Sequence, residues 1–129
     1  MRGIILDTNF LMIPLTQKVD VFSELVSVCD FPFELFVLDR TLEELETIMA
    51  EQSGKNKLAA SIAKQLIETK NVSIIKTVGE NHVDDIIVNI AQERGYLVAT
   101  QDKILRQRLK TVGVQVIFLR QRKYLVVEK

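Results

Sequence analysis

The sequence predicts an α/β fold: a three-layer α/β/α sandwich around a central, mainly parallel sheet of about five strands. Short apolar segments alternate along the chain with segments of helical periodicity, which is typical of a parallel sheet covered by helices. The apolar segments are hydrophobic throughout instead of at every second position, as in strands that are buried on both faces. The 129 residues suffice for one domain and are too few for two, so we expect a single domain over 1–129.

Five segments have the composition of buried strands. Each is rich in Val, Ile, Leu or aromatic residues, and turn-forming or polar residues bound it. The predicted strands cover residues 3–6, 35–38, 72–75, 96–99 and 114–119, and residues 124–127 could add a short terminal strand.

The intervening segments have the spacing of amphipathic helices. The segment 83–91 follows the i, i+3, i+4, i+7, i+8 pattern most closely, and Gly95 ends it. Pro32 lies beyond the first helix, Asn71 is a plausible cap of the third, and Gly113 closes the last. The predicted helices cover residues 19–29, 42–49, 57–68, 83–91 and 104–109.

The composition excludes several classes of protein. No apolar run approaches the roughly 20 residues that a membrane-spanning helix needs, so we expect no membrane partner. The chain reaches an acid at Asp7, which leaves no room for the apolar stretch of a signal peptide, and we therefore expect a cytoplasmic location. Cys29 is the only cysteine, which excludes an intrachain disulfide and a cysteine-rich zinc site.

The charges balance overall but are unevenly placed. Residues 103–129 hold eight of the seventeen basic residues and one of the seventeen acids, Glu128. A basic end is compatible with a polyanion such as nucleic acid, and a solvated basic face is the alternative. The candidate phosphate contacts are Lys55, Lys57, Arg106, Arg108 and Lys110, followed by Arg120, Arg122 and Lys123.

Four acids lie near the carboxyl ends of the predicted strands. Asp7 ends the first strand and Asp102 follows the fourth. Glu44 and Asp84 lie in the first turns of the helices that follow the second and third strands. The carboxyl ends of parallel strands meet at one edge of a sheet, and ligands bind there near the switch in strand order, so we expect these carboxylates to gather at that edge.

Each acid also has a purely structural interpretation. Asp7 and Asp102 are placed to cap the helices that follow them, and Thr41–Glu44 fits a capping box. Asp84 and Asp85 suit the first turn of a helix on electrostatic grounds alone. Four such acids on one edge, however, are required neither by a core nor by a network of ion pairs.

Helical phase distinguishes between neighbouring acids. Asp84 flanks the apolar face of its helix, whereas Asp85 points further toward solvent. Glu44 lies beside Ile48 on the helical wheel, and Glu43 lies far from the apolar stripe. We therefore expect Glu44 and Asp84 to be functional, with Asp85 in a supporting position.

Clustered carboxylates predict a metal site. They repel one another and take up protons unless a cation compensates, and oxygen ligands without His or Cys select Mg²⁺ or Mn²⁺. Such an ion lowers the pKa of bound water and stabilises charge on a phosphoryl oxygen, so the chemistry indicated is hydrolysis of a phosphodiester. Thr8, Asn9 and Thr100 could orient the acids by hydrogen bonds, and ordinary turn chemistry is the alternative.

Other chemistries lack their residues. The chain has no glycine-rich phosphate loop. His82 is the only histidine, and no motif places a Ser or Cys nucleophile beside it. A phosphoaspartate enzyme would need a second acid close to Asp7, where Asn9 stands.

At these positions the chain resembles the PIN domain nucleases. The ordered set covers nearly the whole chain and consists of a strand into Asp7-Thr8-Asn9, the helix-opening pair Glu44-Leu45, Asp84 at a later helix, and Thr100-Gln101-Asp102. Residues 99–106 and 122–124 look most like the compact archaeal single-domain type, which is similar to rRNA-processing and VapC-like PIN ribonucleases.

The resemblance implies Mg²⁺ or Mn²⁺ bound by Asp7, Glu44, Asp84 and Asp102, and endonucleolytic cleavage of single-stranded RNA. It also implies that homodimers are frequent. The toxin branch of the family implies an antitoxin partner, and the rRNA-processing branch implies a ribosome-assembly partner. Our principal hypothesis is a metal-dependent endoribonuclease in RNA processing or decay. A VapC-like toxin and a non-catalytic RNA-binding scaffold stay open as alternatives.

Overall fold

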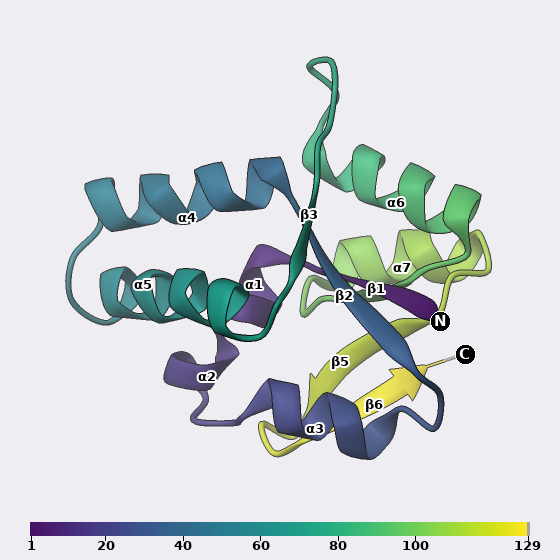
Figure 1. The fold of residues 1–129 in the computed structure, drawn as a ribbon, viewed down its shortest axis with the longest axis horizontal. Coiled ribbons are helices and arrows are strands. Elements are labelled where there is room, and N and C mark those ends of the chain that lie inside the picture. Colours follow the sequence, from purple (N-terminus) through teal and green to yellow (C-terminus); the bar gives the residue numbers. More distant parts are fainter. Residues whose placement is uncertain (129) are drawn as a thin grey trace.

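A computed structural model describes residues 1–128 as one six-stranded sheet with helices on both faces (Figure 1). The sheet order is β3-β2-β1-β4-β5-β6; the first five strands are parallel to their neighbours, and β6 is antiparallel to β5. The strands are β1 (Arg2–Leu6), β2 (Phe33–Leu38), β3 (Ser73–Ile75), β4 (Leu97–Ala99), β5 (Val116–Arg120) and β6 (Tyr124–Glu128). The fold class predicted from the sequence is confirmed.

Helices occupy most of the connections between strands. The helices are α1 (Thr8–Leu11), α2 (Ile13–Thr16), α3 (Val21–Val28), α4 (Asp39–Glu51), α5 (Gly54–Thr69), α6 (Val83–Arg94) and α7 (Lys103–Thr111). Gly95 ends α6 with a φ of 69°, a left-handed conformation that favours glycine, as predicted. Among residues 1–128, no helix combines the length and the apolar character needed to cross a bilayer.

The sheet separates two hydrophobic cores. Successive side chains of a strand point to opposite faces, so Ile4 and Leu6 of β1 enter one core and Ile5 enters the other. Helices α1 to α5 contribute to the first core, for example through Phe10 and Leu45, and α6 and α7 contribute to the second. Burial on both faces explains why the strands are continuously apolar.

The strand order places the switch point beside the central strand. From β1 the chain proceeds outward through β2 and β3, and then returns to the other side of β1 to form β4. The connections that leave β1 and β4 therefore diverge to opposite faces of the sheet. In sheets of this order, the crevice beyond these two strand ends is the usual place for a ligand.

The structure corrects several predicted boundaries. The sheet has six strands, because the terminal segment that could add a strand does so: it pairs with β5 as Tyr124–Glu128. The short helices α1 and α2 were not predicted, and α5 begins at Gly54 instead of near residue 57. Helix α4 begins at Asp39, which places Glu44 in its second turn instead of its first. Thr41 therefore lies inside the helix, and the predicted capping box does not form.

Candidate active site

Asp7 occupies the switch point at the end of β1. Its backbone N–H donates to the carbonyl of Ala99 at 2.9 Å, which extends the pairing of β1 and β4 by one residue. Its Oδ1 accepts the N–H of Thr8 at 2.9 Å, so Asp7 caps α1, as its structural interpretation predicted. The residue is only 9% exposed, and its carboxylate is thus held at the edge of the core.

Thr100 connects two of the predicted acids. It follows β4, is fully buried, and donates its hydroxyl proton to Asp7 Oδ2 at 2.7 Å. The same hydroxyl oxygen accepts the backbone N–H of Asp102 at 3.1 Å. The predicted orienting role of Thr100 is thus matched by its geometry, whereas Thr8 contacts Asp7 through its backbone.

The pKa of the Asp7 carboxyl is raised from 3.8 to about 6. Burial is the largest cause, because it disfavours the charged form. The negative charges of Asp84 and Glu44 raise the pKa further, while the hydrogen bonds from Thr100 and Thr8 lower it. The charges of Asp84 on α6 and Glu44 on α4 therefore reach the Asp7 carboxylate at the end of β1.

Glu44 and Asp84 approach this environment from two helices. Glu44 is exposed on α4, and Asp84 is half-buried in the first turn of α6. The N–H of Asp84 donates to Nδ1 of His82, the cap of α6, at 3.3 Å. Neither carboxylate takes part in the ion pairs found among residues 1–128, so both remain available to a ligand.

Asp102 has a structural role and retains a free oxygen. It is the N-cap of α7, and its Oδ1 accepts the N–H of Leu105 at 3.0 Å. The capping interpretation is therefore correct for this acid. Its second carboxylate oxygen is not used by the cap, so a capping role and a ligand role are compatible.

The acids have the donor chemistry for a hard cation, but they are not gathered around one point. Over residues 1–128, no three side chains of His, Cys, Asp or Glu form a group that could hold a metal ion as they are placed. The charges of Asp84 and Glu44 nevertheless raise the pKa of Asp7, and no lysine or arginine side chain within residues 1–128 lowers it. An oxygen-only donor set with uncompensated negative charge fits Mg²⁺ or Mn²⁺.

Two polar side chains fix the ends of β4 and β5: Asn9, which was predicted to orient the acids, and Gln101, which was not given a role from the sequence. Asn9 Oδ1 accepts the N–H of Gln101 at 3.1 Å, which ties α1 to the segment after β4. The Gln101 side chain bonds both backbone groups of Leu119, accepting at 2.6 Å and donating at 3.3 Å. Gln101 therefore holds the segment that carries Thr100 and Asp102 against β5.

Asp39 is a second residue that sequence analysis missed. It begins α4 and accepts hydrogen bonds from the N–H and the hydroxyl of Thr77, at 3.1 and 2.7 Å. Beside it, Arg40 Nη1 donates to the carbonyl of Asn81 at 2.8 Å. Burial opposes its ionisation, but the bonds from Thr77 and from the Arg40 N–H outweigh this and lower the pKa of Asp39. These contacts fasten the loop that leads to Asp84 onto the helix that carries Glu44.

Three of the five predicted phosphate contacts form ion pairs within the chain. Arg108 pairs with Asp85 at 2.6 Å, which directs the predicted supporting acid toward α7. Arg106 and Lys110 both pair with Glu128, at 3.7 and 3.8 Å. Lys55 and Lys57 are exposed near the start of α5, on the opposite side of the sheet from α7.

Comparison with known proteins identifies the family. The sequence profile described as a PIN-like domain matches residues 4–122. Ribonuclease VapC4 of Methanocaldococcus jannaschii is 34% identical over 127 residues, which cover 96% of this chain and 95% of the relative. The rRNA-processing protein fcf1 of Schizosaccharomyces pombe is 31% identical over 116 residues, 88% of this chain and 57% of the relative.

A solved structure agrees with both the fold and the sequence relationship. The PIN domain endonuclease Utp24 superposes with a TM-score of 0.78 at 28% identity, covering 98% of this chain and 90% of the other. The chain therefore belongs to the PIN-like domain family.

Proposed function

We propose that this protein is a metal-dependent endoribonuclease that hydrolyses phosphodiester bonds of single-stranded RNA. One observation carries the proposal: Asp7 is a buried carboxylate at the switch point, and its pKa is raised by burial and by the charges of Asp84 and Glu44. Relatives named as ribonucleases and a PIN endonuclease of similar structure support nuclease activity.

In this proposal Asp7, Glu44, Asp84 and Asp102 hold Mg²⁺ or Mn²⁺. The side chain of Glu44 is exposed and that of Asp84 is half-buried, and neither is held by an ion pair among residues 1–128, so both can change rotamer when an ion binds. When bound, the ion supplies Lewis-acid stabilisation of charge on the phosphoryl oxygen and activates water for attack. Thr100 holds the Asp7 carboxylate in one orientation, and the α7 cap fixes Asp102.

The direct test is cleavage of a labelled single-stranded RNA with Mg²⁺, with Mn²⁺ and with EDTA. We expect cutting with a divalent ion, none in EDTA, and a loss of at least about 100-fold in Asp7→Asn and in Glu44→Gln. Glu43→Gln is the matched control, since Glu43 is the exposed neighbour of Glu44 on α4. Undiminished metal-dependent cutting by Asp7→Asn would refute the assignment. RNA binding without cutting in any metal would favour the scaffold alternative.

Two biological settings are compatible with this chemistry. A VapC-like toxin of a toxin–antitoxin pair is favoured by the nearly complete mutual coverage with the relative named Ribonuclease VapC4. A role in RNA processing or decay is favoured by the likeness to an rRNA-processing protein and to Utp24. Growth arrest on expression that requires Asp7, and that a co-expressed neighbouring gene product relieves, would select the toxin.

A further inference from the structure

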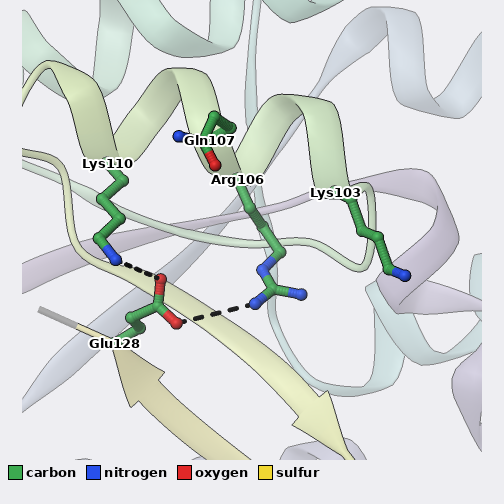
Figure 2. A pocket seen from close by; sticks show the side chains of 5 residues that line it. All are labelled: Lys103, Arg106, Gln107, Lys110 and Glu128. Carbon is green, nitrogen blue, oxygen red and sulfur yellow. Dashed lines mark ion pairs between the residues drawn. The ribbon is translucent and has the colours of Figure 1, made fainter.

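A basic pocket lies between α7 and the end of β6, outside the acid site. It has a volume of about 270 Å³, and Figure 2 shows the side chains that line it. The α7 residues recur at spacings of three, four and seven, so they share one face of the helix. The lining residues are Lys103, Arg106, Gln107 and Lys110 of α7 and Glu128 of β6.

Arg106 packs against an aromatic ring beside its ion pair with Glu128. Its guanidinium carbon lies 3.6 Å from the centre of the Phe118 ring, and its Nε is buried with no hydrogen-bond partner in the structure. The contact with the ring limits the movement of the guanidinium, and Figure 2 shows one of its outer nitrogens directed toward Glu128 in the pocket. A guanidinium fork held in this way is matched to the oxygens of a phosphate.

Glu128 lies between the two cations that it faces. Its Oε2 is 3.7 Å from Arg106 Nη2 and its Oε1 is 3.8 Å from Lys110 Nζ, both longer than a hydrogen bond. With Lys103, the lining holds three cations and one carboxylate, and it therefore keeps a positive charge. The carboxylate occupies the position that an anion bound by both cations would take.

We propose that this pocket binds a phosphate group of the RNA backbone, and that Glu128 occupies it until the RNA displaces the carboxylate. The proposal rests on the proposed function, because it assigns the same RNA a second contact. Asp102 caps α7 and Lys103 follows it, so the helix leads from the acid site to Lys110 in about 12 Å. One RNA strand can therefore reach both places.

Displacement of Glu128 is energetically easy. Partly exposed ion pairs contribute little to stability, and the carboxylate keeps access to water when it leaves. A phosphate within the same cations releases condensed counterions from the RNA, which the carboxylate does not. The pocket therefore favours a polyanion over the chain's own acid.

The test measures binding of a labelled single-stranded RNA by fluorescence anisotropy, in EDTA so that no cutting occurs, over a series of salt concentrations. The double variant Lys103→Gln/Lys110→Gln should weaken binding roughly tenfold and lower the salt slope by about 0.7, the contribution of one phosphate contact with a single strand. Glu128→Gln should tighten binding about two- to fivefold.

Glu46→Gln is the matched control for Glu128→Gln. Glu46 of α4 also pairs with a lysine, Lys64 of α5, but on a different surface. Removal of its charge should leave RNA affinity unchanged if the effect of Glu128 belongs to the pocket. If both variants bind RNA more tightly to the same extent, the change in net charge explains the effect, and the proposal is overturned.

The remaining outcomes separate the pocket from the nuclease. Cutting by the wild-type protein, combined with unchanged affinity and salt slope in the double variant, would overturn the pocket and leave the nuclease intact. Pocket-dependent binding without cutting in any metal would support the pocket and refute the nuclease. Displacement of the RNA by a polyglutamate peptide of equal charge at equal concentration would overturn the RNA assignment in favour of an acidic protein partner. Thermal unfolding of each variant checks that it is folded.

Discussion

The hydroxyl of Thr100 donates to the carboxylate of Asp7 at 2.7 Å, across 93 positions of the sequence. The same oxygen accepts the N–H of Asp102, so one buried side chain sets the relative position of two acids on neighbouring strand ends. This bond favours the charged form of Asp7 and opposes the effect of burial on its pKa.

Replacement of Thr100 by valine is the first test of this arrangement. Thr100→Val keeps the shape of the side chain and removes the hydrogen bond, which for a charged acceptor is worth about 1.5–3 kcal/mol. We expect the pKa of Asp7 to rise above its present value of about 6 and kcat/KM for RNA near neutral pH to fall by about tenfold or more. The pH profile of cleavage measures both effects.

Thr100→Ser is the control, because it restores the hydroxyl without the methyl group. Its profile should lie near that of the wild-type protein. A valine variant with an unchanged profile would show that Thr100 is only a packing residue.

The raised pKa of Asp7 predicts how stability varies with pH. The folded state binds this proton more tightly than the unfolded state, whose pKa is near 3.8. The contribution of Asp7 to stability therefore decreases as pH rises from about 4 to about 6, and the ionised group then disfavours folding by about 3 kcal/mol. Asp7→Asn should unfold at higher denaturant concentration than the wild-type protein at pH 7.5, and the difference should disappear near pH 4.

Divalent ions should reverse this difference. Mg²⁺ or Mn²⁺ that binds the folded state stabilises it by mass action, so it should raise the Tm of the wild-type protein at pH 7.5 and raise that of Asp7→Asn far less. The free energy of unfolding of the wild-type protein minus that of Asp7→Asn isolates the contribution of Asp7 from those of the other acids. If this difference increased between pH 4 and pH 6, it would contradict the burial of an uncompensated charge.

The two roles of Asp102 can be separated by substitution. Asp102→Asn retains an oxygen for the N–H of Leu105 and should leave the free energy of unfolding within about 0.5 kcal/mol of wild type. Asp102→Ala removes the cap and should lower it by about 1 kcal/mol. Both variants should cleave RNA more slowly than the wild-type protein, because both lack the negative charge of Asp102. Full activity in Asp102→Asn would confine this residue to capping.

The contact between Asp39 and Thr77 should matter for activity as well as stability. Asp39→Ala removes three hydrogen bonds and should lower the free energy of unfolding by about 2 kcal/mol. Because the released loop precedes Asp84, kcat/KM should fall too, by several-fold in a folded sample.

Asp20→Ala is the matched control for Asp39→Ala. Asp20 caps α3 through Ser23, and neither of its side-chain hydrogen bonds involves an acid of the site. Its loss should reduce stability by about 1 kcal/mol with kcat/KM unchanged. A similar loss of activity in both variants would mean that lower stability alone explains the effect of Asp39.

Most of the fold follows from patterns that extend over several residues. The continuously apolar strands and the helical periodicity, which is clearest in α6, predicted the sheet and the longest helices. The acids at the strand ends predicted the edge of the sheet that carries the candidate site. Helices α1 and α2 were missed because four residues are too few to establish a period, and Pro14 interrupts the segment. Glu44 was placed one turn too early because Thr41–Glu44 matches a capping box, whereas Asp39 and Thr77 start the helix sooner.

Contacts between distant elements could not be predicted in the same way. Arg108 meets Asp85 and Arg106 meets Glu128 only because α7 packs beside α6 and β6. In the sequence these arginines appear as free basic residues of a charged end. The charge count was correct, but it contains no information about which cations already have a partner. The four ligand assignments stay predictions until metal binding is measured.

The strand order also bears on when the acid site can exist during synthesis. Asp7 emerges from the ribosome early, but its partner Thr100 and the strand that borders it follow only after three-quarters of the chain. A nascent or truncated polypeptide that stops before β4 has the first acid without its orienting hydroxyl. If the site cuts RNA, its oriented form therefore cannot exist before β4 and Thr100 have been synthesised.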